Sequence, residues 1–211
     1  MDPDEASPLV NGLARLVLWL RGHGPHGLLK RRIHSLGTDL GIEAWATGAL
    51  IAALLGFACS GSAPWLSAVV VAAAAIRLFE ILVNAVHVTL FHGFIDKKPL
   101  AGPRRIVILL LFNYIELVFW FAAAYRALLA HIVPASQASP VAILAHSLSA
   151  ASGFGDGAIS QVPSLMSAIA IFESGVGLFM AVAVIARFVS LLPRPPGDAR
   201  NGDASPPTRA A

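Results

Sequence analysis

Long apolar stretches separated by short polar segments are the dominant pattern along this chain. Four of these stretches, at about 44–60, 64–91, 106–129 and 163–192, are long enough to cross the hydrocarbon core of a bilayer as helices. A further stretch, 139–150, would reach only about 18 Å as a helix, against a core of roughly 30 Å. Such a segment can enter a membrane and turn back. The pattern therefore predicts an all-α integral membrane protein with four transmembrane helices and a re-entrant segment between the last two.

The segments outside the spans have their own patterns. Residues 9–20 form a short, interrupted apolar stretch, which is typical of a helix lying at the membrane surface. The glycine-rich residues 22–27 predict a flexible linker. We assign 1–38 to a cytoplasmic N-terminal segment with this interfacial helix, and 39–100 to the first two transmembrane helices. The tail, 193–211, is rich in proline and charge and is expected to be disordered.

Composition supports a membrane protein. Of the 211 residues, 56% are hydrophobic and only 13% are charged, whereas soluble domains carry about 25% charged residues. The calculated pI near 9.5 would fit a nucleic-acid-binding protein. The basic residues flank the apolar stretches, however, so we interpret them as topology signals and expect no nucleic-acid partner. Cys59 is the one cysteine, which excludes an internal disulfide.

The basic residues set the expected orientation because cytoplasmic loops are enriched in Lys and Arg. They are Lys30, Arg31 and Arg32 before the first span, Lys97, Lys98, Arg104 and Arg105 between the second and third spans, and Arg194, Arg200 and Arg209 after the last. With histidine counted as neutral, the one charged residue between 130 and 162 is Asp156. We therefore expect a multi-pass protein of a cell (inner) membrane with both termini in the cytoplasm and the loop after residue 150 outside.

A glycine-rich motif follows the short apolar stretch. Ser139 and Pro140 form a helix start, with an N-cap residue and a first-turn proline. After this helix comes Ser152-Gly153-Phe154-Gly155-Asp156-Gly157. Alternating glycines reach positive φ without a Cβ clash, so backbone carbonyls can line up toward a passing cation. The motif is typical of an ion selectivity filter.

Residues 139–192 resemble the pore module of the potassium channel superfamily, which has a pore helix, a Thr-Val-Gly-Tyr-Gly-Asp filter and an inner helix. Ala151-Ser152-Gly153-Phe154-Gly155-Asp156 stands in register with that filter, with Ala151 in place of the threonine. The resemblance implies a re-entrant pore helix and a filter at 151–155 that conducts potassium or other monovalent cations, with the carbonyls of 151 to 154 coordinating the ion. It further implies that Asp156 lies at the outer mouth and that Gly175 or Gly177 is a gating hinge. It also implies a pore module over 101–192.

The resemblance carries further expectations about partners. A ring filter needs four loops, so we expect a homotetramer in the lipid bilayer. Potassium is the permeant ion, and no other cofactor is expected. A second hypothesis is a non-conducting membrane scaffold with a pore-like fold.

A third, less favoured hypothesis is an intramembrane aspartyl protease, because Gly153 to Asp156 also matches a Gly-x-Gly-Asp motif. That chemistry needs a second carboxylate nearby. The candidates, Asp39 and Asp96, are both predicted on the cytoplasmic side, opposite Asp156. We therefore expect no enzyme activity.

Several polar residues lie within the spans. Arg77 and Glu80 are three positions apart and can pair, and Asn113 and Glu116 share a helix face. Such residues usually point into the bundle. We favour an interhelical clamp over an ion pathway, and the predicted depths bring Arg77 within reach of Glu116. Glu173 either braces the filter or faces neighbouring helices.

Two negative expectations complete the sequence analysis. His87 and His92 are five positions apart and do not share a helix face, so we expect no metal site. Arg77 is the one arginine within the first two spans, whereas a voltage sensor needs several in series.

Overall fold

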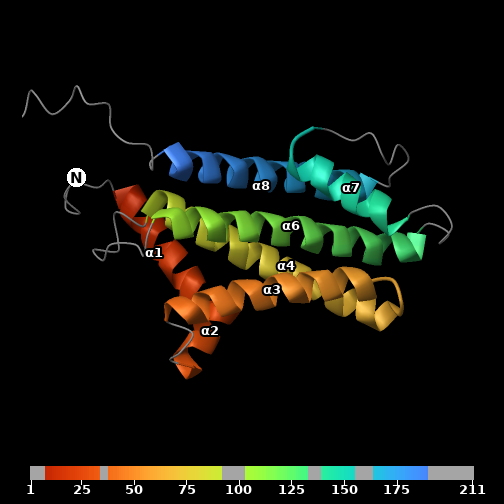
Figure 1. Ribbon diagram of the computed structural model, residues 1–211, viewed down its shortest axis with the longest axis horizontal. Helices are drawn as coiled ribbons and strands as arrows, with labels where there is room; N and C mark the ends of the chain where they lie inside the picture. Colours follow the sequence, from red (N-terminus) through yellow and green to blue (C-terminus); the bar gives the residue numbers. More distant parts are fainter. Residues whose placement is uncertain (1–7, 34–37, 92–102, 133–138, 155–163, 190–211) are drawn as a thin grey trace, which may run out of the picture.

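The computed structural model describes residues 8–33, 38–91, 103–132, 139–154 and 164–189, and every regular element in these ranges is helical (Figure 1). The elements are α1 (Pro8–His23), α2 (Pro25–Arg32), α3 (Asp39–Cys59), α4 (Pro64–Val86), the π-helix η3 (His87–Phe91), α6 (Pro103–Ile132), α7 (Pro140–Ala151) and α8 (Ser164–Val189). Helices α3, α4 with η3, α6 and α8 are long and apolar enough to cross a membrane. The expectation of an all-helical chain with four such spans is confirmed.

The first span begins earlier than its apolar pattern indicated. Helix α3 starts at Asp39 rather than near Ala44. Thr38 explains the difference, since its Oγ1 accepts a hydrogen bond of 3.2 Å from the backbone N–H of Gly41. This N-cap satisfies one of the free donors of the first turn, so the helix extends into a polar segment that hydropathy alone leaves out.

The prediction of a flexible linker at 22–27 is wrong. Helix α1 continues through His23, and α2 begins at Pro25. Gly24 alone is extended between them, with φ −67° and ψ 162°. Proline at the first position of a helix has the φ that a helix needs and loses no intrahelical hydrogen bond there. The glycine-rich segment is therefore a sharp corner between two helices.

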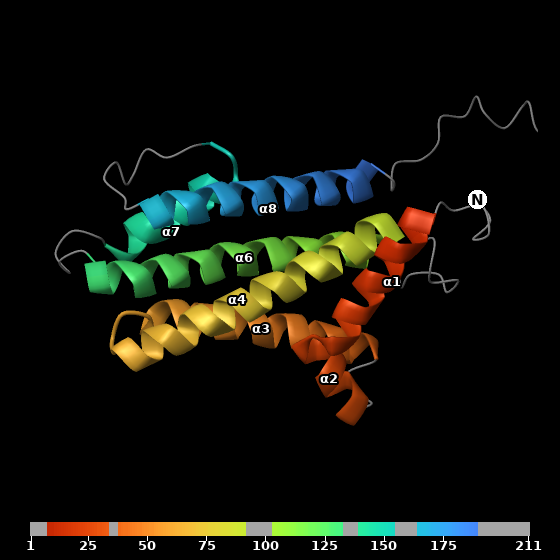
Figure 2. The ribbon, with the colours of Figure 1, turned by 180° about the vertical axis from the view of Figure 1, so that it is seen from behind.

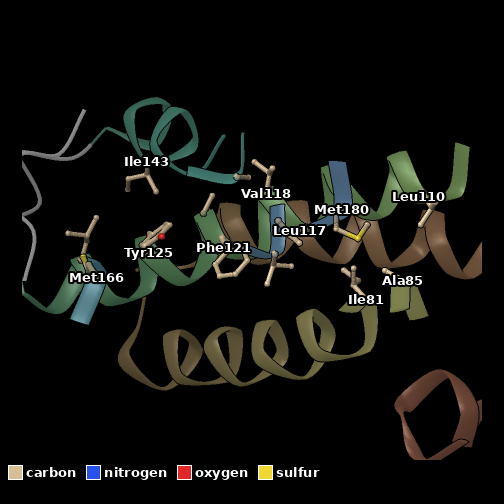
Figure 3. Packing of buried hydrophobic residues seen from close by; sticks show 14 of the residues in the cluster. Ile81, Ala85, Leu110, Leu117, Val118, Phe121, Tyr125, Ile143, Met166 and Met180 are labelled. Carbon is tan, nitrogen blue, oxygen red and sulfur yellow. The ribbon is translucent and has the colours of Figure 1, made fainter. Parts of the chain in front are cut away.

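Helix α6 is the centre of the bundle. It packs against α3 and α4 on one side and against α7 and α8 on the other, as both views show (Figures 1 and 2). The largest core cluster combines residues of α4, α6, α7 and α8. Figure 3 shows Phe121 and Tyr125 of α6 with Ile143 of α7, and with Met166 and Met180 of α8.

Small residues permit this close packing. Ala122, Ala123 and Ala127 of α6 are buried, and Gly56 of α3 lies so near Trp120 that an added Cβ would be 3.2 Å from the ring. Lipid tails are as apolar as leucine, so association of spans depends on close van der Waals contact and on interhelical polar bonds. Helix α6 makes both close apolar contacts and interhelical polar bonds.

Helix α1 lies across one end of the bundle rather than along it (Figure 2). It contacts α4 and η3, with Ala14 and Val17 buried against Val83. Leu13, Leu16 and Trp19 are exposed. A crossing helix with exposed apolar side chains fits the expected interfacial helix better than a further span.

Candidate functional site

Helix α7 begins as the sequence predicts. Ser139 is the N-cap, and its Oγ accepts a 3.1 Å hydrogen bond from the backbone N–H of Ala142. Pro140 occupies the first helical position. The helix then runs to Ala151, one residue beyond the predicted end. At about 1.5 Å per residue its length is about 18 Å, too short to cross a membrane.

Helix α7 returns alongside α6. The Oγ of Ser147 in α7 lies 2.9 Å from the backbone carbonyl oxygen of Val118. Just after the end of α7, the hydroxyl oxygen of Ser152 lies 3.5 Å from that of Tyr114. Tyr114 is about 17 Å along α6 from Pro103 and about 27 Å from Ile132. The carboxyl end of α7 therefore lies beside the interior of α6, as Figure 1 also shows.

Gly153 ends α7. It has φ +72°, in the left-handed region that glycine reaches without a Cβ clash. The N–H of Gly153 donates to the Ala150 carbonyl at 3.0 Å, and the N–H of Phe154 donates to Ser149 at 3.1 Å. These two bonds form a Schellman C-cap with glycine at its usual position.

The described residues of the predicted filter have two different environments. Ala151 is 1% exposed and belongs to the main core cluster. Ser152, Gly153 and Phe154 are on the surface, and Phe154 is 90% exposed. Gly155 and Asp156 lie outside the described residues. The exposed part of the motif thus begins one residue later than the predicted filter.

Of the two hinge candidates of α8, Gly177 is buried and Gly175 is exposed. A Cβ added to Gly177 would collide with the backbone of Ala151, 2.7 Å from its Cα, whereas a Cβ at Gly175 would meet nothing within 4 Å. Gly177 therefore allows the end of α7 to approach α8 closely, and this contact turns the Ala151 carbonyl toward α8. Gly175 lies on the uncovered face of α8.

Glu173 of α8 joins three helices. Its Oε1 lies 2.5 Å from Ser147 Oγ of α7, and its Oε2 accepts a 2.8 Å hydrogen bond from the Tyr125 hydroxyl of α6. Glu173 is completely buried. His146 packs edge-on against Tyr125, with ring centroids 4.9 Å apart. The sequence left two roles for Glu173, bracing the filter or facing neighbouring helices. The side chain lies between α6, α7 and α8, and it contacts α7 one helical turn before that helix ends.

Arg77 of α4 forms the expected clamp with Glu116 of α6. Its Nε donates to Glu116 Oε1 at 2.6 Å and its Nη2 to Oε2 at 3.0 Å, while Nη1 donates to Glu80 at 2.5 Å. Trp120 adds a 3.0 Å hydrogen bond to Glu116, and the Trp45 ring lies 5.4 Å from the Arg77 guanidinium. The predicted pairing is confirmed.

A cavity of about 120 Å³ lies beside this clamp, between α1, α3, α4 and α6. Arg77, Glu80, Asn84 and Asn113 contribute polar atoms to its lining. A cavity of this size and polarity can hold ordered water. Asn113 therefore lines the cavity next to the clamp rather than forming part of the ion pair.

Tyr125, Ser147 and Arg126 were not singled out in the sequence. Arg126 of α6 donates a 2.8 Å hydrogen bond to the Phe57 carbonyl near the end of α3. Each of the three is a polar residue inside an apolar stretch, which is a signal for a buried contact. Their partners could not be read from the sequence, because those lie far away along the chain.

The residues considered for a protease or for a metal site lie only partly within the described ranges. Asp39 starts α3 at the end of the bundle away from α7 (Figure 1), while Asp96, Asp156 and His92 lie outside the described residues. Among the residues that the structure describes, no three His, Cys, Asp or Glu side chains lie close enough to hold a metal ion.

Comparison of the chain with protein-family models, with curated proteins and with solved structures found no match. The function is therefore inferred from the residues and their arrangement.

Proposed function

We propose that this chain is one subunit of a homotetrameric cation channel that conducts potassium or other monovalent cations. The observation that carries this proposal is the path of α7. This helix runs back along α6 and ends, at a glycine turn, beside the interior of both α6 and α8. In a membrane, non-helical backbone at such depth is tolerated where it is buried in protein or lines a water-filled cavity.

The ends of the loop support a re-entrant path. Gly177, which contacts the end of α7, is about 20 Å along α8 from Ser164, at 1.5 Å per residue. The chain thus leaves α7 at an interior level of α8 and enters α8 at its amino end. A filter loop makes this kind of return, since its carbonyls replace the hydration shell of an ion over part of the membrane thickness.

The proposed filter starts at Ser152. Ala151 is buried against Gly177, so its carbonyl would need a shift of α7 to reach an ion. Ser152, Gly153 and Phe154 are exposed in the single subunit, and Gly155 and Asp156 would complete the segment. Asp156 would lie at the outer mouth, with both termini in the cytoplasm.

The uncovered face of α8 is the proposed inner wall of the pore. Its exposed residues recur at helical spacing and include Leu165, Ile171, Gly175, Leu178, Val182 and Ile185. In a four-fold assembly this stripe would face the axis and the neighbouring subunits. Gly175 lies within the stripe and is the better hinge candidate, because Gly177 is held against α7.

Reconstitution tests the proposal. Purified protein in liposomes should give a cation flux, with K⁺ compared against Na⁺, and should cross-link to tetramers in mild detergent and in lipid. Tetramers without flux would favour a non-conducting scaffold. A protein that stays monomeric or dimeric in every detergent and in lipid would refute the channel, because one or two loops cannot form a ring filter.

A further inference from the structure

Glu116 and Glu173 are both buried glutamates in apolar helices, but their partners differ. Both oxygens of Glu116 accept hydrogen bonds from the Arg77 guanidinium, so its negative charge is compensated. The partners of Glu173 are the hydroxyl groups of Tyr125 and Ser147. Neither is a cation. An ionised carboxylate with no cation beside it is costly within a membrane.

The hydrogen-bond donors around Glu173 can be counted. The Tyr125 hydroxyl supplies one proton, which goes to Glu173 Oε2. The Ser147 hydroxyl has a single proton but lies within hydrogen-bond distance of two acceptors, Glu173 Oε1 and the Val118 carbonyl oxygen. Ser147 can therefore donate fully to only one of them. Both contacts are satisfied together if Glu173 supplies a proton of its own.

We propose that Glu173 is a neutral carboxylic acid that donates its proton to Ser147, which in turn donates to the Val118 carbonyl. This chain of hydrogen bonds joins α8 to α7 and α7 to α6. The chain of hydrogen bonds includes α7 through Ser147, one helical turn before α7 ends at Ala151. Glu173 is thus a positioning residue for the turn that carries Ser152 to Phe154. Its importance for conduction rests on the proposed function, while its protonation does not.

The titratable groups facing Glu173 in the described residues are few. Tyr125 of α6 donates to it directly, and the ring of His146 of α7 contacts the Tyr125 ring in a T-shaped arrangement. The ion pairs of Arg77 with Glu80 and Glu116, and of Arg105 with Glu43, do not include Glu173.

Infrared spectroscopy of the purified protein tests the proton. The difference spectrum between wild type and Glu173→Gln should contain the C=O stretch of a protonated carboxylic acid, and this band should shift in D₂O. Glu116→Gln is the matched control, since it should remove only carboxylate bands. Ser147→Ala should move the Glu173 band to higher frequency, because the acid loses its acceptor. Absence of the acid band in wild type at neutral pH would overturn the proposal.

Stability provides a second readout. The glutamine amide can donate to Ser147 and its carbonyl can accept from Tyr125, so Glu173→Gln should unfold at nearly the wild-type temperature, whereas Glu173→Ala should unfold at a clearly lower one. Equal losses in both variants would overturn the proposal. If the acid band and this pattern are found but liposomes show no flux, the positioning residue stands and the channel function fails.

Discussion

Arg77 of α4 and Glu116 of α6 form a two-point ion pair in the interior of the bundle, with N···O distances of 2.6 and 3.0 Å. The two residues are far apart in the sequence and on different spans. Glu80 and Trp120 complete the cluster through their own hydrogen bonds to it. Arg77 is therefore shared between two carboxylates, and Glu116 depends on it for charge compensation.

Breaking this pair should destabilise the protein strongly. Arg77→Ala leaves Glu116 buried without its cation, and we expect a loss of about 3–5 kcal/mol in the free energy of unfolding. Glu116→Gln in the same chain should restore part of the loss by removing the unpaired charge. Unfolding of the two single variants and the double variant in detergent measures the coupling, expected at about 0.5–3 kcal/mol. Additive effects would contradict direct pairing, and Arg15→Ala, at an exposed site, is the control.

The two glycines of α8 should respond oppositely to alanine. Gly177→Ala places a methyl group against the Ala151 backbone, so we expect a loss of about 1–3 kcal/mol from overpacking. The methyl group that Gly175→Ala adds has no atom within 4 Å. Because alanine is the better helix former by about 1 kcal/mol, this variant should be at least as stable as the wild type. Thermal unfolding of both variants measures the difference. Equal stabilities would mean that α7 does not approach α8 as closely as described.

A substitution at Phe154 should separate the stability of the subunit from its proposed conduction. Its side chain is 90% exposed in the subunit, so Phe154→Ala should change the stability of the subunit by no more than about 0.5 kcal/mol. The flux in liposomes should nevertheless fall sharply, because the residue lies in the proposed filter. Phe79→Ala, at an exposed phenylalanine of α4 outside the proposed pore, is the control and should conduct normally. Unchanged flux in Phe154→Ala would place the filter elsewhere.

The orientation predicts which cysteines an impermeant thiol reagent reaches in intact cells. Cys59 is exposed at the end of α3 and should label from outside, because the basic residues favour a cytoplasmic amino end for that span. A cysteine introduced by Arg200→Cys, in a Cys59→Ser background, should label only after the membrane is permeabilised. The reverse pattern would invert the topology.

The sequence by itself determined the helices and several of their ends. Apolar length indicated the four candidate spans, since a helix satisfies its own backbone hydrogen bonds in lipid. Ser139 with Pro140 marked the start of α7, because capping is a local interaction between neighbouring residues. Thr38 had the same effect at α3, but hydropathy does not detect it. Gly153 has a positive φ, which glycine reaches without a Cβ clash.

Only the tertiary structure decided how these helices are used. It placed α6 at the centre, paired Glu173 with Ser147 and Tyr125, and assigned the two glycines of α8 to different faces. It also turned the glycine-rich segment near Gly24 into a corner between helices. Packing between distant segments depends on which faces meet and how closely backbones approach. A hydropathy pattern, which lacks distances between helices, does not contain that information.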